Sequence, residues 1–380
     1  TKLGLLSSLQ LTENKAYTDL ITIPMHNIGK KEFLTALGMG LLHVVFSAFV
    51  ILSSIWLCFA VWIQEPLGWL FSRVLIGIWI AFALSILGIY ISQHFFSRRK
   101  DVIIYIIAFI LSLFWYFSLE AKQDRQWNPE VAQALHYERQ GDVITLHNVR
   151  NFKWNPDGSF QENWETRQFN LNDIQGVNII TSYWMGPQIA HTLVSFDFAN
   201  AKPLTFSIEI RKEATEDFSA IGGFFRQFEL SLIASDEKDI IYTRSNIRGE
   251  QVYFFPINMA KPEMKALFEE YLSKSDELRK QAKWYNTLTS NCTTLVFDMV
   301  QAVSKQPLPS DYRLLASGYL PNYLNDLGAI DQNWDMKTWY QKAHVNPRTQ
   351  EFSKFEHQSS ENYSQVLRYG LPQSNPALAP

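Results

Sequence analysis

The chain has 380 residues, a formal net charge of −3 and an aromatic content of 14%. No basic block stands out along it, which argues against a nucleic-acid partner. Its apolar residues are concentrated in the N-terminal third, so the two parts of the chain are considered separately.

Three apolar stretches occupy the N-terminal third. Residues 33–63, 74–91 and 102–119 contain no Asp, Glu, Lys or Arg. A helix that crosses the hydrocarbon core of a bilayer needs about 20 apolar residues. We therefore predict transmembrane helices at about 33–63, 70–91 and 102–119. The alternative, three buried helices of a soluble core, would normally show polar residues on one face.

The basic residues of the short loops predict how these helices are oriented. Lys30 and Lys31 precede the first stretch, and residues 98–100 are Arg-Arg-Lys, between the second and third. Because basic loops stay in the cytoplasm, residues 1–32 and the loop at 92–101 are predicted to be cytoplasmic. Everything from residue 120 onwards is then extracytoplasmic.

The extracytoplasmic part alternates between strand and helix patterns. Residues 143–170 predict a hairpin around an Asn-Pro-Asp-Gly turn, and 191–198 and 203–210 predict two further strands. Residues 216–234 look mixed or helical, 240–247 and 251–255 are strand candidates, and 261–282 and 292–304 have helical spacing. The charge-rich stretch 235–248 is interpreted as a solvated face. These patterns predict one α+β domain at 120–330, and a C-terminal extension at 331–380 whose elements are not assigned.

Cys292 is the only cysteine outside the apolar third, because Cys58 lies within the first predicted span. An unpaired thiol in an oxidising compartment suggests a functional role. Asn291 is a good helix N-cap, so Cys292 falls in the first turn, where the helix dipole favours a thiolate and amides can hold an oxyanion. The alternative is a buried cysteine that acts as a small apolar side chain.

A thiol nucleophile needs a base, and five histidines lie beyond the spans: His136, His147, His191, His344 and His357. A hairpin turn centred on Asn200 would pair His191 with Glu209, and a carboxylate there would orient the imidazole. A two-residue slip would bring Ser207 or Arg211 opposite instead. The prediction is Cys292 as nucleophile, His191 as base and Glu209 as orienter. The alternatives are a surface histidine at a strand end, and a solvated Glu209 paired with Arg211.

Other residues near these motifs are candidates for binding substrate. Trp284 and Tyr285 precede the cysteine and could line a groove for an acyl chain, or could be ordinary core. Asn291, Ser195 and Arg211 complete the predicted set. The sequence has no Cys/His cluster with zinc spacing and no glycine-rich phosphate loop, so no metal and no cofactor are predicted.

Five sequence blocks together resemble a known family. They are "VRNF" (149–152), "HTLVSFDF" (191–198), "SIEIR" (207–211), "GFFRQFEL" (223–230) and "WYNTLTSNCTTLVF" (284–297). In this order they are similar to the bacterial extracytoplasmic domain family typified by the Lnb lipoprotein N-acyltransferase, over about residues 130–330. The family's Cys and His correspond to Cys292 and His191. The order of histidine strand and cysteine helix also resembles a permuted papain-like fold, as in lecithin:retinol acyltransferase-like enzymes.

The resemblance implies a thiol-dependent acyltransferase on the periplasmic face of the bacterial inner membrane. Its partners would be membrane lipids and the N-terminus of a lipidated lipoprotein, with no metal or soluble cofactor. Two alternatives remain open: a cysteine peptidase or amidase acting on cell-wall peptide, and a non-enzymatic membrane scaffold in which Cys292 is buried.

Overall fold

The computed structural model describes residues 30–92, 97–354 and 359–374. The predicted cytoplasmic segment up to residue 29, residues 93–96 of the predicted cytoplasmic loop and the candidate His357 lie outside the described residues. The chain divides into two compact units at the Tyr116–Phe117 bond, and each is described by itself.

The first unit consists of three long apolar helices, α2 (Lys30–Gln64), α3 (Trp69–Ser92) and α4 (Arg98–Phe117). All three are long and apolar enough to cross a membrane, with mean hydropathies of 2.5, 2.5 and 1.8 over their most apolar windows. Their outward surfaces carry exposed apolar side chains such as Leu42 and Phe114, which suits hydrocarbon as the solvent. On the inside, Tyr105 is fully buried, and its hydroxyl lies 2.7 Å from Ser53 Oγ.

The second unit is built on an eight-stranded sheet with the strand order β1-β2-β9-β8-β7-β6-β10, in which β5 also pairs with β2. Its neighbours are antiparallel except β2 and β9, which are parallel. A separate two-stranded sheet, β3 with β4, forms the tip of the β2–β5 hairpin. The strands are β1 (His136–Gln140), β2 (Val143–Arg150), β3 (Lys153–Trp154), β4 (Phe160–Gln161), β5 (Trp164–Asn170), β6 (Ile174–Tyr183), β7 (Ala190–Phe198), β8 (Leu204–Arg211), β9 (Glu229–Ser235) and β10 (Gln251–Ile257).

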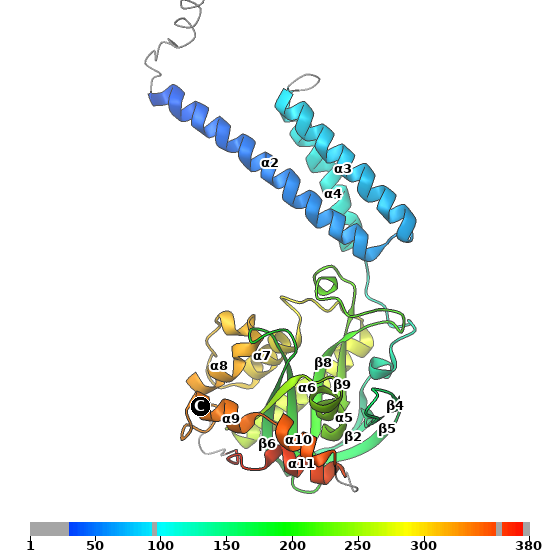
Figure 1. Cartoon of the computed structure of the whole chain (residues 1–380), viewed down its shortest axis with the longest axis vertical. Coiled ribbons are helices and arrows are strands. Elements are labelled where there is room, and N and C mark those ends of the chain that lie inside the picture. The colour runs from blue at the N-terminus through cyan, green and yellow to red at the C-terminus, as the bar shows by residue number, and fades with distance from the viewer. Residues whose placement is uncertain (1–29, 93–96, 355–358, 375–380) are drawn as a thin grey trace, which may run out of the picture. The chain divides into compact units, whose positions relative to one another are not determined.

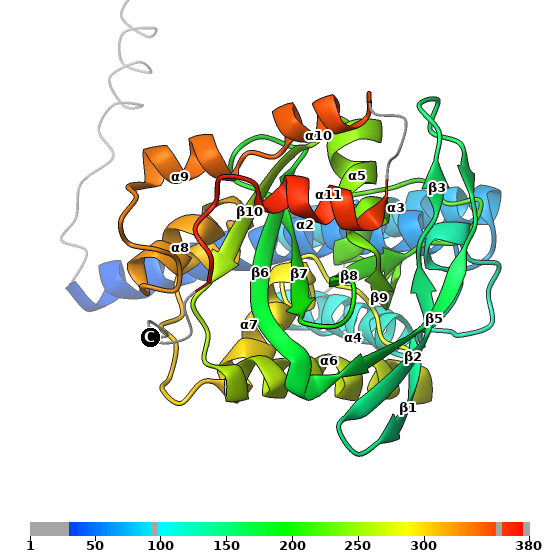
Figure 2. The same cartoon turned by 90° about the horizontal axis from the view of Figure 1, so that it is seen from below.

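Helices cover both faces of this sheet (Figures 1 and 2). The larger core lies under α6 and α7 and contains Phe196, Phe206, Phe268 and Cys292. The smaller core on the opposite face includes Leu193 and Tyr363 and lies under α5, α10 and α11. The helices of this unit are α5 (Glu237–Tyr242), α6 (Lys261–Lys280), α7 (Cys292–Val303), α8 (Leu320–Asp326), α9 (Met336–Ala343), α10 (Asn346–Phe352) and α11 (Ser360–Arg368).

The α+β class and the three long apolar helices predicted from the sequence are confirmed. Two local predictions are wrong. Residues 240–247, predicted as a strand, continue α5 into the π-helical turn Thr243–Ile247, because the Asp236 side chain caps the helix by accepting from Lys238 N. Residues 229–234, part of the stretch predicted as mixed or helical, belong to the central strand β9, which is buried on both faces.

The stretch after residue 330, to which the sequence assigns no element, contributes to both cores. Trp339 of α9 is fully buried in the larger core, and Tyr363 of α11 is fully buried in the smaller one. These helices therefore form part of the domain's hydrophobic interior.

Candidate active site

The β7–β8 hairpin places His191 beside Glu209. The two strands pair antiparallel with Leu193 opposite Ser207 and Val194 opposite Phe206, which is the register centred on Asn200 that the sequence predicted. Continued by one more step on the same face, this register brings residue 191 opposite 209. The side chains meet, with His191 Nε2 3.2 Å from Glu209 Oε1.

Cys292 is the first residue of α7, as the capping pattern predicted. Asn291 is the N-cap, and its Oδ1 accepts from Thr293 N at 2.8 Å and from Thr294 N at 2.9 Å. The Thr294 hydroxyl accepts from Asn291 N in return, which completes a capping box. Cys292, Val296 and Met299 form the buried stripe that packs this helix onto the larger core.

A hydrogen bond between two hydroxyls joins the histidine strand to the cysteine helix. Thr192 Oγ1 lies 2.9 Å from Thr293 Oγ1, and both side chains are buried. Each threonine immediately follows a predicted catalytic residue along the chain. This bond therefore ties the start of α7 to β7, and the charge of His191 acts on Cys292.

The electrostatics of this pair favour a thiolate and an imidazolium. Burial raises the pKa of Cys292, but the charge and hydrogen bond of His191 and the amide of Thr192 together lower it below its usual value. Burial and the charge of Arg244 lower the pKa of His191, whereas Glu209 and Cys292 raise it to about 9. Both shifts favour transfer of the thiol proton to His191.

Ser207 determines which imidazole nitrogen faces the thiol. The Ser207 hydroxyl donates to Glu209 Oε1 at 2.6 Å, so its oxygen is free to accept from His191 Nε2, 2.7 Å away. Nε2 therefore carries a proton and faces the carboxylate, and Nδ1 is the nitrogen left for Cys292.

Behind Glu209 lies a buried arginine that the sequence analysis missed. Arg244 Nη2 donates to Glu209 Oε1 at 2.8 Å, and Nη1 donates to Glu250 Oε2 at 3.1 Å. Glu250 also accepts from the Ser182 hydroxyl and lies 3.9 Å from Arg248 Nη1. The thiolate, Glu209 and Glu250 are thus balanced by the imidazolium and the two arginines. Despite burial, His191 and Arg244 hold the pKa of Glu209 well below its usual range.

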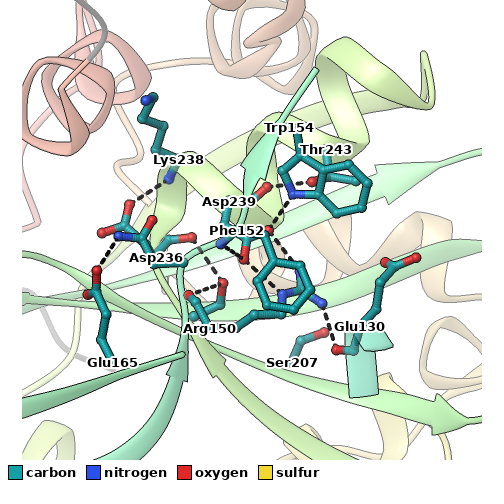
Figure 3. Close-up of polar contacts among 12 residues, drawn as sticks. Glu130, Arg150, Phe152, Trp154, Glu165, Ser207, Asp236, Lys238, Asp239 and Thr243 are labelled. Atoms are coloured by element: carbon teal, nitrogen blue, oxygen red, sulfur yellow. Dashed lines mark hydrogen bonds and ion pairs between the residues drawn. The ribbon is translucent and has the colours of Figure 1, made fainter. Parts of the chain in front are cut away.

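A second buried ion pair fixes the segment that carries Arg244 (Figure 3). Asp239 of α5 is fully buried and accepts from Arg150 Nε at 2.8 Å, from Phe152 N at 2.9 Å and from Trp154 Nε1 at 2.7 Å. Its backbone oxygen accepts from the Thr243 hydroxyl. The interpretation of this charge-rich stretch as a solvated face is therefore wrong for its acidic residues and for Arg244, which are buried and paired with charged groups from other elements.

These groups line a cavity of about 610 Å³ with a mainly apolar wall. Cys292, His191 and Glu209 are in its lining, and Arg150 and Arg244 contribute part of its polar surface. Two of the predicted substrate-binding residues, Tyr285 and Asn291, also line it. Burial, and the neighbouring Cys292 and Glu209, raise the pKa of Tyr285, so its hydroxyl stays protonated.

The other three predicted substrate-binding residues do not line this cavity. Ser195 donates to Glu237 Oε1 at 2.5 Å. Arg211 donates to the backbone oxygens of Val131 and Ala132, and the Trp284 indole donates to Leu119 O at 3.1 Å.

Of the other described histidines beyond the apolar helices, none is beside the thiol. His136 stacks on His147 on the β1–β2 hairpin, and His344 stacks on Tyr253. No group of three or more His, Cys, Asp or Glu side chains among the described residues is arranged to hold a metal ion.

The fold and the site define a class: a membrane protein with an α+β periplasmic domain that carries a buried Cys–His–carboxylate arrangement in a cavity. Residues 160–318 match the family model of the Lnb N-terminal periplasmic domain. The match supports an Lnb-type family for this part of the chain, which contains Cys292, His191, Glu209 and Arg244. No curated protein and no solved structure matches the chain significantly.

Proposed function

We propose that this protein is a membrane-bound N-acyltransferase that moves an acyl chain from a diacylglyceryl lipid, through a thioester on Cys292, to the N-terminal amine of a lipoprotein. The observation that carries the proposal is that Cys292, His191 and Glu209 together line one mainly apolar cavity, with His191 Nε2 3.2 Å from Glu209 Oε1. The family match supports the same assignment. A permuted papain-like layout of the domain remains part of this proposal.

In the first transfer the Cys292 thiolate attacks the ester carbonyl carbon of the donor lipid. As the tetrahedral intermediate collapses, the ester C–O bond breaks and the leaving oxygen takes the proton from the His191 imidazolium. The products are a Cys292 thioester and the deacylated alcohol. Glu209 accepts from the Ser207 hydroxyl and also lies beside His191 Nε2. It thereby keeps the imidazole in the tautomer that this step needs.

The helix cap limits which amides can stabilise the oxyanion. Thr293 N and Thr294 N both donate to Asn291 Oδ1, so these two amides are not free to bind the oxyanion. Of the first-turn amides expected to serve this role, the Cys292 amide remains. Within the described part of the chain the Cys292 amide donates to no acceptor. We assign the oxyanion to this amide and to the protonated hydroxyl of Tyr285, which lines the same cavity.

In the second transfer the neutral α-amine of the lipoprotein attacks the thioester carbonyl. The amine gives up a proton to His191, the C–S bond breaks, and the thiolate is regenerated with an amide as product. An ordinary α-amine has a pKa of about 8, so a neutral fraction exists near neutral pH. The apolar cavity wall favours acyl chains over the polar cell-wall peptide that a peptidase or amidase would bind.

The test uses the full chain with a synthetic diacylated lipopeptide and a phospholipid, followed by mass spectrometry of the intact protein and of the lipopeptide. Wild type, Cys292→Ser and the matched control Cys58→Ser are compared. We expect wild type and Cys58→Ser to gain one acyl mass and to release N-acylated lipopeptide, and Cys292→Ser to lose the product.

Two outcomes would overturn the proposal. N-acylated product from Cys292→Ser at the wild-type rate would remove the thiol from the mechanism. Release of free fatty acid or of cleaved peptide, without any N-acylated lipopeptide, would identify water as the acceptor and the protein as a hydrolase.

A further inference from the structure

Large apolar side chains are exposed around the mouth of the cavity. After the third apolar helix, the described residues include nine large apolar side chains that are exposed, and six of them line this one cavity. They come from four separate loops and are between 39% and 56% exposed. These six residues, here named the apolar rim, are Trp184, Met185, Phe218, Phe224, Leu288 and Leu315.

Backbone hydrogen bonds hold the rim loops in place. The Leu315 loop is joined to the Trp184 loop because Gly318 N donates to Gln188 O at 2.9 Å. A Cβ at Gly318 would overlap the backbone oxygen of Pro187, so the close approach depends on glycine. On the other side of the mouth, Thr287 N donates to Gly223 O at 3.2 Å and joins the remaining loops. The exposed apolar side chains of the rim therefore lie on loops that are held to one another by backbone hydrogen bonds.

Two of the rim loops lie near Leu119, close to the residue where this unit of the chain begins. Leu119, two residues after the end of α4, accepts from Trp284 Nε1 and from Arg226 Nη1, both at 3.1 Å. Arg226 is two residues from Phe224 of the rim, and Trp284 is four residues from Leu288. A chain spans at most about 3.5 Å per residue, so these rim backbones lie within about 14 Å of Arg226 or Trp284.

We propose that the apolar rim inserts into the outer leaflet of the bilayer, so that the cavity opens into lipid. The six rim side chains carry no charge, and Trp with Phe, Leu and Met is the composition of surfaces that enter the interface between headgroups and acyl chains. Exposed apolar patches of this kind mark membrane or protein contacts. Lipid is favoured over a protein partner because this unit of the chain begins at Phe117, the last residue of an apolar helix long enough to cross a membrane.

This inference rests on the proposed function and adds a route for its substrate. With the rim in the bilayer, a lipid donor could reach Cys292 without its acyl chains crossing water. Its test requires no acyl transfer, so a failure here and a failure of the proposed chemistry can be told apart.

The test places an environment-sensitive fluorophore on the rim of the full chain. In a Cys58→Ala, Cys292→Ala background, Phe218→Cys and Leu315→Cys are labelled with a nitrobenzoxadiazole probe. Tyr369→Cys is the matched control, because Tyr369 is 80% exposed and does not line the cavity. Each protein is reconstituted in phosphatidylethanolamine–phosphatidylglycerol vesicles with or without doxyl-labelled phospholipid, and iodide serves as the aqueous quencher. Because the two rim positions lie on separate loops, the test can still be read if one of the two variants misfolds.

We expect both rim probes to emit at shorter wavelength than the control, and doxyl lipid to quench them at least threefold more strongly. Equal quenching at rim and control positions would overturn the proposal. Protection of the rim probes from iodide without quenching by doxyl lipid would also overturn it, because a protein surface, such as a second copy of the chain, would then cover the rim.

Discussion

Arg244 and Arg368 each bridge two carboxylates near opposite ends of β7, and each cluster includes a serine. Arg244 joins Glu209 to Glu250, with Ser207 donating to Glu209. Arg368 joins Asp197 to Glu237, with Ser195 donating to Glu237. In chemical composition the two clusters are almost the same.

Their surroundings differ. The Arg244 cluster lies in the cavity wall, and its Glu209 contacts the histidine next to the thiol. The Arg368 cluster fastens α11 to α5 and β7, and none of its residues lines the cavity. A buried ion network is therefore no indicator of function by itself. The cavity, and the nucleophile that one network orients, distinguish the candidate active site from the structural cluster.

Replacing His191, the proposed base, is the most direct test that the Arg244 cluster belongs to an active site. His191→Gln should lower the rate of acyl transfer by about 10²–10⁴-fold, because none of the other described histidines beyond the apolar helices lies beside the thiol. The measurement is the rate of N-acylated lipopeptide formation, with iodoacetamide alkylation of Cys292 as a second readout. His344→Gln is the matched control, since His344 stacks on Tyr253 away from the thiol. Equal activity in the two variants would contradict the role of His191.

Exchanging each arginine for methionine tests the comparison itself. Arg244→Met leaves Glu209 and Glu250 without their shared cation, and removing one partner of a buried ion pair costs about 3–5 kcal/mol of stability. Arg368→Met should cost less, because that side chain is 26% exposed. Both variants should therefore unfold at lower denaturant concentration than wild type.

The two variants should differ in chemistry at a temperature where both are folded. Arg244→Met should also slow the reaction and alter its pH profile, since Glu209 loses its orienting partner. Arg368→Met should keep the kcat and the pH profile of the wild type. If Arg368→Met reduces kcat as much as Arg244→Met, the two clusters are not functionally distinct.

Much of the site follows from local rules of sequence. Alternation along 191–198 and 203–210 places His191 and Glu209 on the same face, and the assumption of a short turn centred on Asn200 then gives the observed register. The cap at Asn291 predicts the start of the helix at Cys292. These features depend on residues close together in the chain, where periodicity and capping are informative.

Arg244 could not be found in that way. Its partner Glu209 comes from the distant strand β8, and its π-helical turn follows a run of apolar residues that favours a strand by propensity. Charge-rich sequence gives no sign of burial, because burial depends on partners supplied by the tertiary fold. For the same reason the six rim residues, scattered over four loops, form a surface only when the loops meet.

Neutralising one carboxylate in each cluster gives a smaller and more specific effect. In Glu209→Gln the charge that raises the pKa of His191 is lost, while burial and Arg244 still lower it, so that pKa should fall from about 9. The alkaline limb of the activity profile should then move to lower pH, with a rate loss of about 10–100-fold, on the order of 1.4–2.7 kcal/mol. For Cys292 the substitution has two opposite effects, because the less charged His191 lowers the pKa of the thiol less, while the repulsion from Glu209 that raises this pKa is lost. The pH dependence of alkylation by iodoacetamide measures which effect is larger.

Asp197→Asn is the corresponding change in the other cluster, where the carboxylate faces Arg368. It should leave the pH dependence of both activity and alkylation as in wild type. A shift of the same size in Asp197→Asn would show that the effect is general destabilisation and not the tuning of His191.

The smallest expected effect comes from the cap that begins α7. Asn291→Ala removes the acceptor of the Thr293 and Thr294 amides and the donor to Thr287 O, and should cost about 1 kcal/mol of stability. Asp335→Ala removes the cap of α9, whose side chain accepts from Thr338 N at 2.8 Å, and should cost a similar amount. Thermal unfolding and the rate of Cys292 alkylation at pH 7 are measured for both. Only Asn291→Ala should slow alkylation, by a few fold, because it alone loosens the turn that holds the thiol beside His191. Equal alkylation rates in the two variants would show that the packed stripe of α7, and not its cap, positions Cys292.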